Sequence, residues 1–161
     1  MSHRLIPLSG TKEEIYKQLL PQLRCLVENE DSHIANLANI TAALKSTLGF
    51  FWVGFYLVDG PWLVLGPFQG EPACTRIAYG KGVCGKAWEL SSALVVDDVD
   101  KFEGHIACSA KSRSEIVVPV IKNNKVIAVI DVDSEQLAAF DDVDLHYLTE
   151  IARLVAGLPG L

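Results

Sequence analysis

The segment HIACSAKSRSEIVVPV, residues 105–120, joins a polar, serine-rich loop to a run of β-branched residues. The β-branched run predicts a strand over residues 115–121, so Cys108 lies on the loop that enters this strand and Glu115 lies at the strand's mouth. A reactive thiol needs a setting of this kind, on a polar loop beside an ionisable group. The segment therefore offers Cys108 as a candidate nucleophile and Glu115 as its acidic neighbour.

A second apolar run, residues 125–133, follows after a turn at residues 123–124, and the two runs predict a β-hairpin. Successive strand side chains point to opposite faces of a sheet. Asp131 and Asp133 therefore share one face, while Val132 between them packs the core. We expect both aspartates to point into one pocket with Glu115.

The remaining cysteines are spread along the chain. Cys74 and Cys84 lie on segments interrupted by glycine and proline, whereas Cys25 lies beside the apolar stripe of a predicted helix, where it is expected to be core. The wide spacing and the absence of a C-x-x-C pair fit zinc poorly, so we expect no metal. The candidate site is thus three cysteines, with Cys108 among them, and three carboxylates.

Length and composition set the broad class. The chain has 161 residues, half of them hydrophobic, which predicts one domain over residues 1–161. A net charge of -6 with scattered basic residues argues against a nucleic-acid surface. Residues 1–8 lack the apolar run of a signal peptide, and no apolar stretch is long enough to span a bilayer. We therefore expect a cytoplasmic protein with four free or reactive cysteines.

Two helices are predicted before the first strand. Residues 11–14, TKEE, form a capping box that begins an amphipathic helix, and Pro21 in its interior predicts a kink or a division in two. The second helix begins at Asp31 or Ser32, has Ile34 on its apolar face, and ends at Gly49.

An aromatic hairpin is predicted next, from residues 50–58, a turn at 59–61 and residues 62–66. Alternation places Trp52 and Tyr56 on one face, where they either line a pocket or simply pack. Residues 67–73 are predicted to be loop.

Short elements follow the hairpin. A strand is expected at residues 76–78, and a glycine-rich turn over residues 80–88 leads into a short helix whose start could bind an anion or stabilise a Cys84 thiolate. A strand at residues 93–96, an acidic loop and a last helix capped by residues 141–144 complete the chain. The fold class is α+β, with a central, largely antiparallel sheet of five to six strands. The N- and C-terminal helices cover one face, and the ligand site lies under loops on the other.

The motifs GKGVCGKAW, HIAC, SEIVVPV, IDVDS and FDDVD, in this order after an aromatic hairpin, resemble those of the free methionine-(R)-sulfoxide reductases, a family built on a single GAF domain. The likeness runs from the first helix to the last. It implies that Cys108 attacks the sulfoxide, that Cys74 and Cys84 are the other redox cysteines, and that the carboxylates bind substrate. The substrate-binding residues implied are Trp52, Tyr56, Glu115, Asp131 and Asp133.

The residues are suited to this chemistry. A Cys108 thiolate would attack sulfur while Glu115, if protonated, gives a proton to the oxygen, leaving a sulfenic acid. The aspartates would take the ammonium group. A second cysteine would then form a disulfide for thioredoxin to reduce, with Cys74 favoured over Cys84 and both left open.

Three basic residues lie on the loop around Cys108. His105, Lys111 and Arg113 are expected to be solvated loop residues rather than parts of the site. The alternative function is a non-enzymatic GAF module that binds a small ligand or senses redox state. A homodimer is expected from the resemblance and from the apolar terminal helices.

Overall fold

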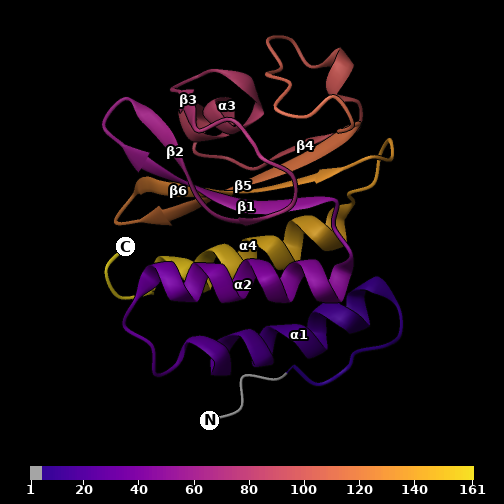
Figure 1. Ribbon diagram of the computed structural model, residues 1–161, viewed down its shortest axis with the longest axis vertical. Helices are drawn as coiled ribbons and strands as arrows, with labels where there is room; N and C mark the ends of the chain where they lie inside the picture. The colour runs from indigo at the N-terminus through magenta and orange to yellow at the C-terminus, as the bar shows by residue number, and fades with distance from the viewer. Residues whose placement is uncertain (1–4) are drawn as a thin grey trace.

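A six-stranded sheet divides the molecule into a helical side and a loop side (Figure 1). The structure is a computed structural model and describes residues 5–161. The helices are α1 (Lys12–Val27), α2 (His33–Leu48), α3 (Gly82–Leu90) and α4 (Asp142–Ala156), with a 3-10 turn η1 (Val99–Lys101). The strands are β1 (Trp52–Asp59), β2 (Trp62–Gln69), β3 (Arg76–Ala78), β4 (Leu94–Val96), β5 (Ser114–Lys122) and β6 (Lys125–Ser134).

The strand order is β3-β2-β1-β6-β5-β4, and all neighbouring strands are antiparallel. On one side α2 and α4 lie against the sheet and α1 lies outside them; α3 and the long loops lie on the opposite side (Figure 1). This arrangement confirms the predicted α+β class, with the terminal helices on one face.

The main core lies between the sheet and these helices. It is built from side chains that alternate along the strands, such as Val53 and Phe55 of β1 and Ile130 and Val132 of β6, all fully buried. Burying one such side chain contributes about 1.5–3 kcal/mol. Since alternate residues must point the other way, Trp52 and Tyr56, as well as both aspartates of β6, face the loop side.

Helix ends follow the local sequence signals. Thr11 and Glu14 form the expected capping box of α1, and Gly49 ends α2 in a left-handed conformation with φ of 67°. Pro21, however, does not divide the first helix: α1 is one element from Lys12 to Val27. Leu19 and Leu23, on either side of the exposed proline, are fully buried, and their packing holds the helix together across it.

Two burial predictions for the helices were wrong. Cys25 is exposed rather than core, because it lies beside the buried stripe of α1 and not within it. Ile34 is 60% exposed in the first turn of α2, ahead of the residues that face the sheet. Residues 1–4, on which the absence of a leader was partly argued, lie outside the described residues. Within residues 5–161 no helix is long and apolar enough to cross a membrane.

The aromatic hairpin forms as predicted but its second strand is longer. β2 continues to Gln69, whereas residues 67–73 were predicted to be loop. The register of β1 and β2 shifts between Gly54 and Tyr56, so the partner strand carries an extra residue at Gly66 and Pro67. A bulge of this kind accepts proline inside a sheet, because the ladder is already interrupted there.

Candidate active site

Three predicted site residues lie in one row across the middle of the sheet. Trp52 of β1 pairs with Asp133 of β6, and Asp133 pairs with Glu115 of β5. In the neighbouring row Gly54 pairs with Asp131. Directly opposed residues on adjacent strands project to the same face, so the register alone gathers these side chains on the loop side.

Gly54 makes room for the indole of Trp52. A Cβ at this position would lie 2.4 Å from the ring carbon Cη2 of Trp52 and 2.5 Å from Cβ of Phe68. The indole stacks on Phe68 with ring centroids 5.3 Å apart, and its N–H donates to the carbonyl of Glu71 at 3.0 Å. The Trp52 side chain is therefore fixed in position and forms an apolar wall beside the carboxylates.

A pocket lies above this row, covered by the start of α3 and by two loops, residues 70–75 and 104–113. Its cavity is about 40 Å³, room for very few water molecules. Seven of the eight predicted site residues line this pocket, and the eighth, Cys74, is bonded to one of them, Cys108. The lining includes Trp52, Tyr56, Cys84, Cys108, Glu115, Asp131 and Asp133.

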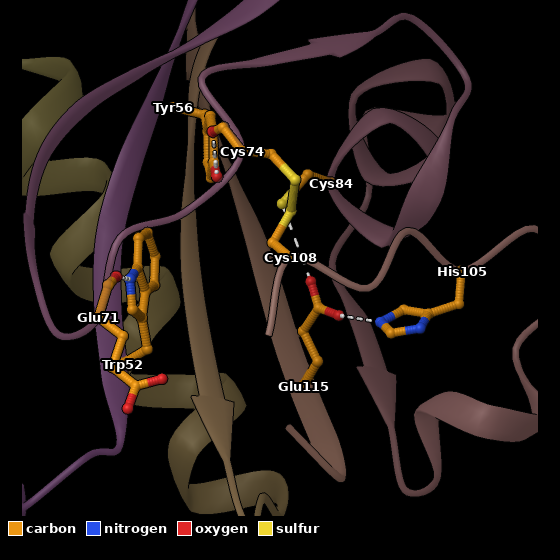
Figure 2. The surroundings of a disulfide bond; sticks show 8 residues. All are labelled: Trp52, Tyr56, Glu71, Cys74, Cys84, His105, Cys108 and Glu115. Carbon is orange, nitrogen blue, oxygen red and sulfur yellow. Dashed lines mark hydrogen bonds and ion pairs between the residues drawn. A yellow bond between two sulfur atoms is a disulfide. The ribbon is translucent and has the colours of Figure 1, made fainter. Parts of the chain in front are cut away.

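Cys74 and Cys108 form a disulfide in the cover of the pocket (Figure 2). Their Cα atoms are 5.4 Å apart although 34 residues separate them in sequence. The Tyr56 hydroxyl donates to the carbonyl of Cys74 at 2.9 Å and so ties one loop to β1. The ammonium of Lys111 lies 2.5 Å from a carboxylate oxygen of Glu71 and links the two loops. The bonded pair is the one favoured from the sequence.

Cys84 lies beneath the disulfide on the first turn of α3 and is fully enclosed. Its thiol donates to Oε1 of Glu115 over 3.9 Å (Figure 2). Burial and the nearby carboxylates raise the pKa of Cys84 well above its usual value. The helix start therefore does not stabilise a Cys84 thiolate, one of the two uses predicted for it, because desolvation and the neighbouring carboxylates outweigh the helix dipole. Cys84 is a neutral thiol in this state.

The three carboxylates are buried away from solvent and lie close enough to one another for their charges to repel. Burial, and after it the charge of Asp131, raises the pKa values of Glu115 and Asp133 well above the ordinary range. Burial raises the pKa of Asp131 to about 6. Its Oδ1 is the one fully buried side-chain oxygen or nitrogen within residues 5–161 that has no hydrogen-bond partner. A cationic group placed here would pair with these carboxylates and lower their raised pKa values.

His105 belongs to the site, although it was expected to be a solvated loop residue. Its Nε2 lies 3.7 Å from Oε2 of Glu115, and its side chain is only 15% exposed (Figure 2). Burial lowers the pKa of His105, so the imidazole is neutral near pH 7. Lys111 and Arg113 are exposed as expected. The position of His105, three residues before Cys108 on the same loop, was the available signal.

Glu71 is a second residue that sequence reasoning missed. Its carbonyl accepts from Trp52 and its carboxylate pairs with Lys111, so it connects the apolar wall to the loop of Cys108. Its only sequence signal was its place three residues before Cys74.

Comparison with known proteins agrees with this geometry. The family model of the GAF domain matches residues 33–157, and fold and site together define a GAF-domain protein with a cysteine-containing pocket. The chain is 58% identical to GAF domain-containing protein A of Dictyostelium discoideum, over 91% of this chain and 93% of the relative. It is 44% identical to the free methionine-R-sulfoxide reductase of Escherichia coli, over 87% and 86%. It belongs to the free methionine-(R)-sulfoxide reductase family.

A solved structure supports the same assignment. The free methionine-R-sulfoxide reductase from Neisseria meningitidis, in complex with its substrate, is 50% identical and superposes with a TM-score of 0.94, covering 96% of this chain and 94% of that one.

Proposed function

We propose that this protein reduces free methionine-(R)-sulfoxide to methionine, with Cys108 as nucleophile and Cys74 as the cysteine that resolves the intermediate. The observation that carries the proposal is the Cys74–Cys108 disulfide lying over three buried carboxylates. A disulfide at this place is the expected product of one catalytic cycle, and the carboxylates supply the charge that a free amino acid needs.

The first step uses two groups on opposite sides of the pocket: Cys108 in the covering loop and Glu115 on the sheet. The Cys108 thiolate attacks the sulfur of the sulfoxide, and Glu115 donates a proton to the oxygen. The products are a Cys108 sulfenic acid, the thioether methionine and the Glu115 carboxylate. The raised pKa of Glu115 supports this role, because burial and the charge of Asp131 favour the protonated carboxyl, which is the form that donates. His105 lines the pocket beside that carboxyl, with Nε2 3.7 Å from its other oxygen.

The ammonium and carboxylate groups of the substrate are recognised by charge. Asp131, with its unpartnered buried oxygen, and Asp133 accept the ammonium group, which also relieves their mutual repulsion. The first N–H groups of α3 lack a side-chain cap and start at the pocket, so they suit the substrate carboxylate. Trp52 offers the apolar wall for the methyl group. A methionine sulfoxide inside a polypeptide lacks the free ammonium and is excluded.

The second step closes the disulfide. The Cys74 thiol attacks the sulfenic acid, water leaves, and the Cys74–Cys108 bond forms. Cys84 is also within the pocket and remains the second candidate to resolve the intermediate when Cys74 is absent. Because the disulfide joins the two covering loops over a cavity of about 40 Å³, the bond must be reduced before another amino acid enters.

An external dithiol completes the cycle, and no bound cofactor takes part. Both disulfide cysteines are half-buried rather than enclosed, so a small protein such as thioredoxin can reach them. The reducing cytoplasm is the compartment that supplies such a partner.

The oligomer we propose is a homodimer formed through the helical side, which leaves the pocket free. Ile34 and Ile6, which are 60% and 69% exposed, give this side apolar surface. Light scattering should then yield a mass of two chains rather than the 17.6 kDa of one.

Thiol counting tests the proposed activity. The reduced protein has four cysteines, and one turnover without reductant should leave the two that are free in this structure, Cys25 and Cys84. Stoichiometric methionine should appear with the loss. A protein that binds the sulfoxide and keeps all its thiols would instead be a sensing GAF module, and the proposal would fall.

A further inference from the structure

The free thiol and two of the carboxylates form a compact group beneath the disulfide. Sγ of Cys84 and one carboxylate oxygen each of Glu115 and Asp131 all lie within 4.8 Å of one another, and all three residues are buried. The sulfur and Oε1 of Glu115 are 3.9 Å apart. In a tetrahedral zinc site, bonds of about 2.3 Å to sulfur and 2.0–2.2 Å to oxygen place two such ligands roughly 3.5 Å apart. The sulfur-to-Oε1 distance is within about half an ångström of that spacing, and the other two distances are below 4.8 Å.

A second observation, on Asp131 itself, points to a cationic ligand. Asp131 is 6% exposed, and its Oδ1 has no hydrogen-bond partner. Buried carboxylate oxygens are normally satisfied, and an orphan among like charges points to a ligand. The cavity of about 40 Å³ accepts an ion with a water molecule, while the disulfide above it leaves no room for an amino acid.

The donor set selects the kind of ion. One sulfur and two oxygen ligands suit the borderline-soft Zn²⁺ better than Mg²⁺ or Ca²⁺, which take oxygen ligands alone. Three protein ligands leave the fourth position open for water. His105 Nε2 lies 3.7 Å from the second oxygen of Glu115, at the place where a ligating carboxylate takes its outer contact.

We propose that Cys84, Glu115 and Asp131 form a Zn²⁺-binding site beneath the closed disulfide, and that an ion bound there blocks substrate entry once the disulfide has been reduced. Zinc is here an inhibitor and not a cofactor, since it occupies the carboxylates that face the substrate. The blocking effect rests on the proposed function, whereas the binding of the ion does not.

Zinc titration of the full chain with its disulfide intact tests the site directly. Competition with a chromophoric zinc chelator should give one Zn²⁺ per chain. Asp131→Asn keeps the shape of the side chain and removes its charge, and Cys84→Ser removes the sulfur. Each should raise the dissociation constant at least tenfold. With Cd²⁺ as probe, the thiolate-to-metal absorption band should appear in the natural chain and be absent from Cys84→Ser.

Cys25→Ser is the matched control, because Cys25 is the other free thiol and lies on the surface of α1 outside the pocket. This variant should bind zinc and cadmium as the natural chain does. Unchanged affinity in Asp131→Asn and Cys84→Ser, with both variants folded by circular dichroism, would overturn the proposal. So would loss of binding in Cys25→Ser, or no binding at all. Zinc binding without reductase activity would instead refute the proposed function and leave the site standing.

Discussion

Asp133 of β6 lies directly between Trp52 of β1 and Glu115 of β5, so the apolar wall and the acidic group of the pocket are cross-strand neighbours of one aspartate. This relationship depends on the register of three strands, and a shift by one residue would turn Asp133 into the helical core. The chemistry of the site is therefore tied to the central hairpin of the sheet.

Replacing Cys108 should separate chemistry from folding. Cys108→Ser is expected to abolish reduction of free methionine-(R)-sulfoxide, while the thermal unfolding of the reduced protein stays close to that of the natural chain. The reason is that the residue is half-buried on a loop and contributes little to the core. Cys74→Ser should still release one methionine per chain and then slow. Single-turnover chromatography measures both, and substantial turnover by Cys108→Ser would contradict the assignment.

Gly54→Ala should disturb the pocket through Trp52. The added methyl group would meet the indole at 2.4 Å and Cβ of Phe68 at 2.5 Å, so the ring must move. We expect a loss of about 1–3 kcal/mol in the free energy of unfolding, as for overpacked cores, together with a raised KM. Gly157→Ala is the control, because its new Cβ meets only the carbonyl of Leu154 at 3.5 Å. Equal urea midpoints for the two variants would show that Gly54 is not required.

Asp131→Asn should stabilise the protein above about pH 6 while weakening substrate binding. The folded pKa of about 6 exceeds the ordinary 3.8, so the folded chain holds more protons between these values and its stability falls as the pH rises through that window. The pKa rises by about two units, so the penalty that Asn removes is about 3 kcal/mol. Urea unfolding at about pH 4 and about pH 8 measures it.

The stabilisation by Asp131→Asn should vanish at the lower pH, where the natural side chain is already protonated. Asp59→Asn, at the exposed end of β1, should change neither value. If Asp131→Asn had a lower free energy of unfolding than the natural chain at the higher pH, the buried charge of Asp131 would not be destabilising the fold as we infer.

The Glu71–Lys111 pair should affect the rate of disulfide closure more than stability. Both side chains are about half exposed, and such pairs contribute roughly 0–1 kcal/mol. Yet the pair joins the loop of Cys74 to the loop of Cys108. Lys111→Ala is expected to slow loss of the two thiols after substrate is added, and a double-mutant cycle with Glu71→Ala should show that the two effects are not additive. Full additivity would mean that the contact does not align the loops.

Local signals in the sequence predicted the kind and order of the helices and strands, though not the full length of β2. The Thr11–Glu14 capping box, the left-handed turn at Asn123 and Asn124, and the alternation of apolar and acidic residues before Asp133 all depend on neighbours only a few residues away. Such preferences are set by backbone sterics and by one or two hydrogen bonds, so they can be read without the fold. The family resemblance rested on the same short motifs.

What depends on contacts between distant segments was decided only by the tertiary structure. The burial of Cys84 and the surface position of Cys25 follow from which helix face meets a neighbour. The inclusion of His105 depends on how the loop of residues 104–113 folds over β5. The bond from Cys108 to Cys74 brings together residues that 34 positions separate. The protonation state, the burial and the bonding partner of each of these residues are properties of the folded pocket. Desolvation and charge repulsion act between side chains that are distant in sequence, so the sequence by itself does not reveal them.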